Sequence, residues 1–185
     1  IYYLKMTSLR SKSMEYFANR LVAEKANKNV NLFPYNKLIG AWNFEMKCFN
    51  EHGNIEDESN GEWIFSYILD GTGIQDIFIW PRSNGSMDYY EQGECGTTIR
   101  MPQYDKSGKW DIVYASKWAV DHLIGEEVNG QIIQTGINKD KTDTTIWQWN
   151  FIDIQQNSFV WESIWSKDNG VNWHIATRVQ ASRKK

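Results

Sequence analysis

The sequence has no apolar run long enough to cross a membrane and no charged-then-apolar segment of the kind that directs secretion. It has only two cysteines in 185 residues, Cys48 and Cys95. Free thiols in a reducing cytoplasm are the simplest interpretation, although spacing leaves a disulfide open. The net charge of −3 and the pI near 5.7 argue against nucleic-acid binding through phosphate contacts. Together these features predict a cytoplasmic protein with neither a membrane nor a nucleic-acid partner, and they leave its oligomeric state open.

Common catalytic and cofactor-binding motifs are also missing. The sequence contains no Gly-x-Ser-x-Gly, no Walker sequence and no Gly-x-Gly-x-x-Gly. Its three histidines, His52, His122 and His174, are scattered and lack the short spacing of metal ligands. A haem-binding barrel would need an inward histidine, and His174 alternates with apolar neighbours, which predicts that it faces outward. We therefore predict no metal site and no cofactor, and we assign no catalytic residue.

Aromatic residues are abundant, at 15% of the chain, and include ten tryptophans. Such residues favour pleated, half-buried surfaces and so indicate β-sheet. The predicted strands span residues 38–49, 61–69, 73–80, 96–104, 109–116, 120–128, 131–136, 144–154, 158–166 and 173–182. Short turns separate most of them, and Asn129-Gly130 is the strongest hairpin signal. About ten antiparallel strands would leave exposed edges as an open sheet, so we predict an up-and-down β-barrel.

One amphipathic helix is predicted before the strands, between about Ser11 and Ala26. Its apolar residues recur with the i, i+3, i+4 spacing of a helix face. We expect an N-terminal segment, residues 1–33, that carries this helix outside the barrel, followed by a barrel domain at residues 34–185. The one long connection, Pro81 to Gly96, is predicted to lie over the barrel mouth, as long loops in compact domains often do.

The first predicted strand begins with Gly40-Ala41-Trp42 and then alternates cleanly, with Trp42, Phe44 and Met46 on one face. A Gly-x-Trp before the first strand resembles the entry motif of the calycin superfamily, which includes the lipocalins. Three further stretches resemble an uncharacterised family of bacterial lipocalin-like proteins: Gly61–Gly71 with Ile74–Asp76, Gly96–Arg100, and Phe159–Trp173.

This resemblance implies a calycin-like barrel from about Leu38 to Arg183. In lipocalins a basic residue of the last strand packs over the entry tryptophan. The resemblance therefore implies that Arg178 closes the barrel on Trp42, with Arg183 as the second candidate. It implies no activity, and the helix before the barrel is outside the family pattern.

Three predicted strands carry large aromatic residues on one face. The predicted ligand-binding wall consists of Trp63, Phe65, Tyr67, Trp149, Phe151 and Trp161. A small barrel is either filled by its own side chains or holds one small ligand, and aromatic residues bury well in both cases. A packed core and a ligand cavity are therefore both open at this point.

Polar side chains that point into the barrel could orient a ligand. Gln75 and Asp76 are neighbours, so one of them should face inward near the rim, and we include both in the predicted site. A buried carboxylate would need a partner, which Arg178 or Arg100 could supply. Arg100 and Glu162 alternate with apolar neighbours, so we predict that both point outward.

Binding of a small, mostly apolar or aromatic molecule inside the barrel is the function that these features favour. The second hypothesis is an enzyme of the cyclase or isomerase kind, which would show an inward titratable residue with a shifted pKa. The third is a solid barrel with a structural or interaction role. A continuous internal cavity would separate the first two from the third.

Overall fold

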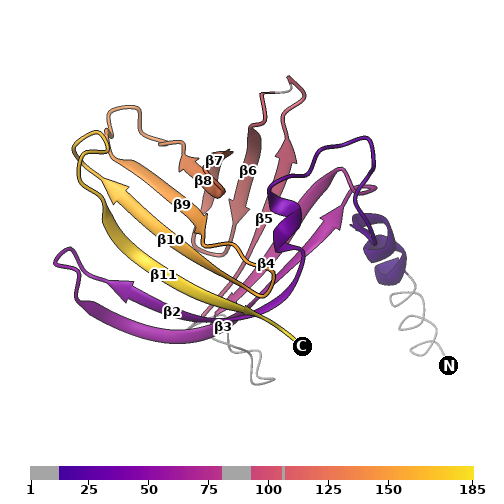
Figure 1. The fold of residues 1–185 in the computed structure, drawn as a ribbon, viewed down its shortest axis with the longest axis horizontal. Coiled ribbons are helices and arrows are strands. Elements are labelled where there is room, and N and C mark those ends of the chain that lie inside the picture. Colours follow the sequence, from indigo (N-terminus) through magenta and orange to yellow (C-terminus); the bar gives the residue numbers. More distant parts are fainter. Residues whose placement is uncertain (1–12, 81–92, 106) are drawn as a thin grey trace, which may run out of the picture.

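Antiparallel strands joined by short turns make up most of the computed structural model, which describes residues 13–80, 93–105 and 107–185 (Figure 1). Residues 13–21 are helical, and one 3-10 turn, η1, spans Tyr35–Leu38. The strands are β1 (Val22–Ala23), β2 (Gly40–Phe49), β3 (Ile55–Ile68), β4 (Gly73–Trp80), β5 (Glu94–Pro102), β6 (Trp110–Ala115), β7 (Val120–Val128), β8 (Gln131–Gly136), β9 (Ile146–Ile152), β10 (Ser158–Ser166) and β11 (His174–Arg183).

All strands belong to one antiparallel sheet in the order β1-β3-β2-β11-β10-β9-β8-β7-β6-β5-β4, and a further pairing between β3 and β4 closes it. Strands β2 to β11 thus form a closed up-and-down barrel, which confirms the predicted fold class. The Asn129-Gly130 turn joins β7 to β8 with φ angles of 53° and 84°. Both angles are left-handed, as a two-residue hairpin loop requires.

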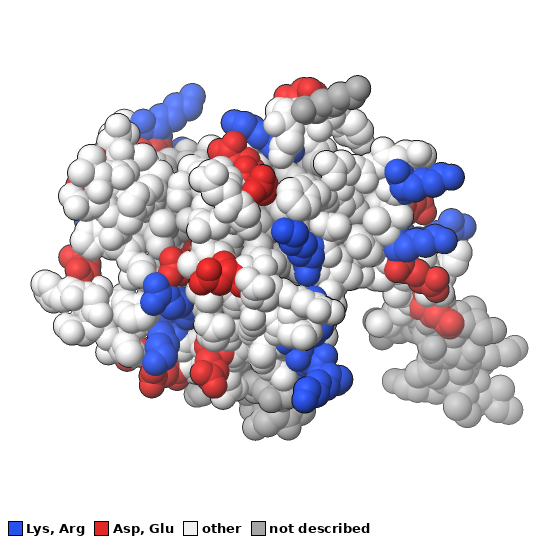
Figure 2. Space-filling model, in the orientation of Figure 1, with Lys and Arg blue, Asp and Glu red and all other residues white. Residues whose placement is uncertain are grey.

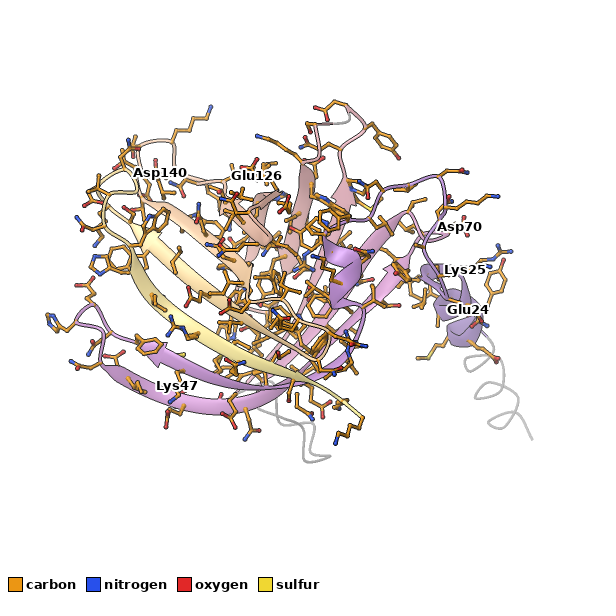
Figure 3. The ribbon with its side chains drawn as sticks, in the orientation of Figure 1. Glu24, Lys25, Lys47, Asp70, Glu126 and Asp140 are labelled. Carbon is orange, nitrogen blue, oxygen red and sulfur yellow. The ribbon has the colours of Figure 1, made fainter. Side chains whose placement is uncertain are left out.

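Side chains that alternate along each strand point into the barrel interior (Figure 3). On β2, Trp42, Phe44 and Met46 are buried, whereas Glu45 and Lys47 are exposed. Inward residues of the other strands complete this core, namely Trp63, Phe65, Ile74, Trp110, Ile112, Leu123, Ile132, Phe151, Phe159, Val179 and Ala181. The residues that we predicted to share inward faces on β3, β9 and β10 are therefore brought together.

One end of the barrel is closed by η1 and by Trp42. Tyr35 and Leu38 of η1 are fully buried, and the Trp42 indole Nε1 donates a hydrogen bond of 2.7 Å to the Leu38 carbonyl oxygen. The Trp42 ring also meets Phe159 edge-on, with 4.8 Å between ring centroids. The segment before β2 therefore closes one end of the barrel, and Trp42 fixes this segment through its hydrogen bond to Leu38.

Arg183, near the end of β11, lies over Trp42. Its guanidinium carbon is 4.0 Å from the indole centroid, and its nitrogens donate to the carbonyls of Gln156 (2.9 Å) and Ile39 (2.8 Å). Gly40 has a φ of 124°, and a Cβ at this position would collide with the Arg183 guanidinium. The glycine of the Gly-x-Trp motif is therefore explained by both its backbone angle and the arginine beside it.

The prediction that Arg178 closes the barrel is wrong, because Arg178 lies on the outer face. Its Nε donates a hydrogen bond of 2.6 Å to Glu162 on β10. In the ladder between β2 and β11, Arg178 is opposite Lys47, whereas Arg183 is opposite Trp42. The second candidate, Arg183, thus occupies the closing position. Glu162, which we predicted to face outward, does so.

Strand β3 begins at Ile55, six residues before its predicted start. Residues 55–60 are largely exposed and acidic, so they lack the apolar alternation from which strands are predicted. They pair with the second half of β2, where an ion pair of 2.9 Å joins Glu58 to Lys47. One surface ion pair thus joins the two strands on this part of the ladder.

The N-terminal helix lies outside the barrel, as predicted, but it ends earlier (Figure 1). Val22 and Ala23 form β1 instead and pair with Ile68 and Tyr67 of β3. The domain boundary between residues 33 and 34 stays a prediction, and Leu32, on its N-terminal side, is buried in the barrel core.

Charged side chains of both signs are interspersed on the face shown in Figure 2, and neither sign covers a continuous area. Among the described residues, no helix is both long and apolar enough to pass through a membrane. Cys48 and Cys95 are free thiols, which agrees with the simpler of the two interpretations of the cysteines.

We expect Arg183→Gln to lower the free energy of unfolding by about 1–3 kcal/mol, because it removes a cation–π contact and leaves carbonyl groups without donors. Arg178→Gln should lower it by less than about 1 kcal/mol, since that ion pair is at the surface. Urea denaturation of both variants measures the difference. Equal losses would contradict the assignment of Arg183 as the closing residue.

Candidate functional site

A cavity of about 330 Å³ lies inside the barrel, in the half away from η1 and Trp42. Its walls come from strands on all sides of the barrel and from the link between β6 and β7. The lining residues are Met46, Trp63, Phe78, Glu94, Thr98, Arg100, Tyr114, Ser116, Trp118, Ala119, Asp121, Trp149, Trp161 and Thr177. The interior thus has a packed half and a hollow half.

Five aromatic rings form a continuous arc along the cavity wall. Phe78 meets Trp63 at 5.0 Å, and Trp63 meets Trp161 at 5.8 Å between ring centroids. Trp161 is in turn 6.0 Å from Trp149, and Trp149 is 5.1 Å from Tyr114. These separations are those of favourable edge-to-face and tilted pairs. The arc therefore supports itself and presents ring surfaces to the cavity.

A buried ion pair between Arg100 and Asp76 forms the cavity floor. Arg100 is 2% exposed and Asp76 is fully buried, and the Arg100 Nη1 donates to Asp76 Oδ2. The Arg100 Nε also donates to Gln134 Oε1 at 3.2 Å, and the Gln134 amide nitrogen donates to the Trp149 carbonyl at 2.7 Å. Charges buried to this degree require such partners, so the floor is held by a fixed network.

Three aromatic rings of the packed half lie next to the Arg100 guanidinium, on the side away from the cavity. Its central carbon is 5.3 Å from the Tyr35 centroid and 5.7 Å from those of Phe65 and Phe151. The Tyr35 hydroxyl donates to Gln134 at 3.2 Å, and burial raises the pKa of Tyr35 above its usual value. Tyr35 therefore stays a neutral donor within the network.

Tyr114 and Glu94 meet at the rim of the cavity, where the Tyr114 hydroxyl donates to Glu94 Oε1. Burial, followed by this hydrogen bond, raises the pKa of Tyr114 above its usual value. Gly96, between Glu94 and Thr98 on β5, leaves room for the Tyr114 ring, which a Cβ at that position would overlap. The glycine at position 96 therefore allows the Tyr114 hydroxyl to reach the Glu94 carboxylate.

Three predicted wall residues, Trp63, Trp149 and Trp161, line the cavity. Phe65 and Phe151 also face inward, but they lie in the packed half beneath the floor. The other predicted site residues, Tyr67, Gln75 and Asp76, are not part of the cavity lining. Tyr67 packs against the core near the closed end.

Asp76 is the inward member of the neighbouring pair Gln75–Asp76, and it lies below the cavity rather than at the rim. Gln75 faces the other side of β4, where its amide nitrogen donates to the Thr97 hydroxyl at 2.9 Å. Gln75 therefore makes no contact with the cavity, and the polar group at the rim is Glu94 instead.

The prediction that Arg100 points outward is wrong. Ile99, which we took to be inward, is 38% exposed, whereas Arg100 is buried. The ladder places Arg100 opposite Ile74 and Thr98 opposite Asp76, so Arg100, Thr98 and Asp76 share the inner face. A carboxylate on the neighbouring strand makes this burial possible, and single-strand alternation contains no information about that partner.

Glu94 and Thr98 were missed as cavity residues. Glu94 was assigned to the long connection, and Thr98 shares its strand face with Arg100, which was predicted to point outward. A usable signal was that Gly96, Thr98 and Arg100 share one face of β5, where a glycine indicates close packing from a neighbour. The connection predicted as a lid falls on residues 81–92, which are outside the described residues, while Glu94 and Cys95 belong to β5.

Metal ligands do not gather in the part of the chain that the structure describes, where no group of three His, Cys, Asp or Glu side chains could hold an ion. His122 and His174 are exposed, and neither lines the cavity.

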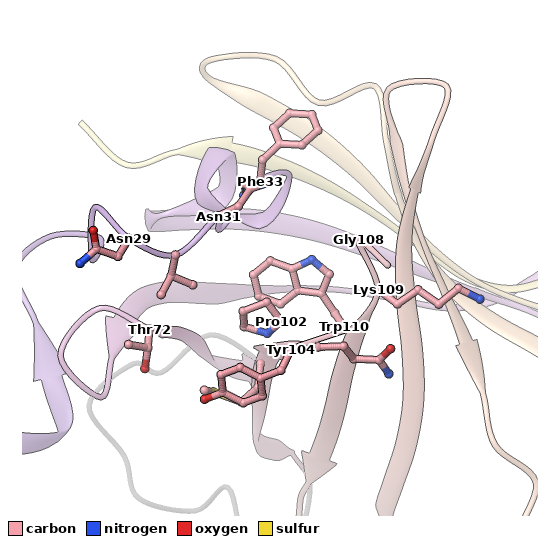
Figure 4. A pocket seen from close by; sticks show the side chains of 12 residues that line it. Asn29, Asn31, Phe33, Thr72, Pro102, Tyr104, Gly108, Lys109 and Trp110 are labelled. Atoms are coloured by element: carbon pink, nitrogen blue, oxygen red, sulfur yellow. Dashed lines mark hydrogen bonds between the residues drawn. The ribbon is translucent and has the colours of Figure 1, made fainter. Parts of the chain in front are cut away.

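A second hollow, of about 590 Å³, lies outside the barrel at its closed end (Figure 4). It separates Asn29–Phe33 from the hairpin that joins β5 to β6. Tyr104 on its edge is 97% exposed, and Trp110 forms its inner wall and is buried. It is larger than the barrel cavity, but its edge is open surface and it lacks the ring arc and the buried charge network of the barrel. We therefore place the candidate site inside the barrel.

Comparison with solved structures finds an S-type phycobiliprotein lyase, CPES, from Guillardia theta. The two chains share 14% identity with a TM-score of 0.53, over 82% of this chain and 90% of the other. No protein-family model matches this chain, and no curated protein matches its sequence. The likeness concerns the fold alone: this chain shares a closed antiparallel β-barrel with that protein.

We expect Arg100→Met alone to lower the free energy of unfolding by about 3–5 kcal/mol, because it leaves the Asp76 carboxylate buried without its counter-charge. The double change Arg100→Met with Asp76→Leu should recover most of this loss. Denaturant unfolding of both single variants and the double variant gives the coupling energy. Additive losses would show that the two side chains do not depend on each other.

Proposed function

We propose that this barrel binds one small, mostly apolar molecule in the cavity between the aromatic arc and Arg100. The observation that carries the proposal is the combination of a cavity of about 330 Å³ with a ring-lined wall and a few convergent polar groups. Cavities that bind small molecules have this composition, and their volumes begin at about 300 Å³. The aromatic arc supplies apolar contact, and Thr98, Tyr114 and Glu94 supply hydrogen-bonding groups.

A barrel of the same fold occurs in a protein named a phycobiliprotein lyase. At 14% identity this likeness supports the barrel alone, so we do not transfer the lyase reaction or its substrate. Membership of a bacterial lipocalin-like family and localisation in the cytoplasm stay predictions.

The enzyme hypothesis is less well supported than the binding hypothesis. An acid–base catalyst works best with a pKa near the working pH. Tyr114 is the cavity residue with a clearly shifted pKa, and the shift is upward, away from neutrality. Tyr114 is therefore suited to donating a hydrogen bond to a bound molecule rather than to exchanging a proton with it. The solid-barrel hypothesis is disfavoured by the cavity itself.

We expect the neutral fluorophore N-phenyl-1-naphthylamine to bind saturably, with one site per chain and with quenching of tryptophan fluorescence. Thr98→Leu should weaken this binding by at least about ten-fold, because the larger side chain occupies cavity volume. Thr97→Leu is the matched control, since Thr97 is the next residue and faces the other side of β5.

Fluorescence titration of the unaltered chain and both variants makes this comparison, with circular dichroism to show that each is folded. Equal affinity in all three would place the probe outside the barrel. Absence of saturable binding to the unaltered chain would contradict the proposed function.

A further inference from the structure

The charges around the barrel cavity are unevenly compensated. Arg100 on the floor is neutralised by Asp76, with which it forms a buried ion pair. Asp121 at the edge pairs with Lys139, with 3.2 Å between Nζ and Oδ1. Glu94 differs from both, because its contact is the neutral Tyr114 hydroxyl, and among the described residues no lysine or arginine pairs with it. Among the described residues that line the cavity, Glu94 is therefore the carboxylate without a lysine or arginine partner.

Glu94 also stands where the ring arc is open. The arc runs from Phe78 on β4 to Tyr114 on β6, by way of β3, β10 and β9. Strand β5, which carries Glu94, pairs with both β4 and β6 and so joins the two ends of the arc. The cavity is thus surrounded by ring surfaces with a carboxylate in the remaining gap.

Ring faces and a carboxylate attract the same kind of ligand. An aromatic face carries negative electrostatic potential, so it attracts a cation, most strongly when water is excluded. Trp118 at the mouth shows this chemistry within the chain, because the Lys117 ammonium lies 4.5 Å from its ring centroid. Lys117 itself is exposed, so its charge is screened by solvent.

We propose that the ligand of this barrel is an organic cation, an apolar or aromatic body with a quaternary or protonated amine that the ring arc encloses and Glu94 faces. This inference rests on the proposed function, since it assigns a charge to the molecule bound in that cavity. Tyr114 uses one carboxylate oxygen, Oε1, and holds the side chain in place. The other oxygen, Oε2, is the acceptor for an amine N–H or the counter-charge for a methylated ammonium.

Three probes of similar size separate charge from shape. Benzyltrimethylammonium is the cation, neopentylbenzene replaces its nitrogen with carbon and is neutral, and 3-phenylpropanoate is an anion. We expect the cation to bind the unaltered chain about ten-fold more tightly than the neutral probe, and the anion to bind more weakly than either. Displacement of N-phenyl-1-naphthylamine measures all three affinities.

Glu94→Gln should weaken the cation by about five- to ten-fold and leave the neutral probe within about two-fold. Glu24→Gln is the charge-matched control. Glu24 is exposed and lies in the segment beside the β3–β4 hairpin, at the closed end of the barrel, near Asp70 in Figure 3. This variant should leave all three affinities unchanged.

The outcomes distinguish the inference from the function on which it rests. Preference for the neutral or anionic probe would overturn the cation assignment while leaving small-molecule binding intact. A cation preference that survives in Glu94→Gln would overturn the role of Glu94. Failure of every probe to bind would overturn both proposals. The comparison on the unaltered chain requires no variant to fold.

Discussion

The ion pair between Arg100 and Asp76 is the constraint on which the interior of this barrel depends. Two opposite charges, both almost fully buried, lie across neighbouring strands and are fixed further by Gln134. Below them the interior is solid with rings, and above them it is hollow. A buried pair of this kind contributes little net stability, but removing either charge is costly because the other is left alone. The pair lies at the boundary between the packed half and the hollow half of the barrel.

The features that could be predicted from the sequence are those that depend on local patterns along one strand. Fold class, strand order and the inward faces of β2, β3, β9 and β10 follow from alternation and turn residues, which are local properties. The inward position of Arg100 depends on Asp76, 24 residues away on another strand. Residues 55–60 form a strand by pairing with the second half of β2, and Arg183 replaces Arg178 because the register of the β2–β11 ladder places it opposite Trp42. In each case the missing information belonged to a partner strand.

The candidate site shows the same limit. Trp63, Trp149 and Trp161 were found because large aromatic residues on one face indicate a wall. Glu94 and Tyr114 come from the paired strands β5 and β6, and they meet because Gly96 leaves room for the Tyr114 ring between them. Whether a polar residue lies at the cavity rim or on the outer surface depends on how the sheet curves, and the sequence of a single strand does not specify that curvature.

The position of Arg183 on β11 also determines when the barrel can close during folding. Its hydrogen bond to Ile39 spans 144 residues, and β2 pairs with β11, the last strand. Contacts of such long range are slow to form, because chain entropy is lost before they are made. During synthesis β2 therefore keeps one edge unpaired until β11 has emerged, and an unpaired edge is a template for aggregation. The closing arginine thus makes the completion of β11 the step after which the free edge of β2 is protected.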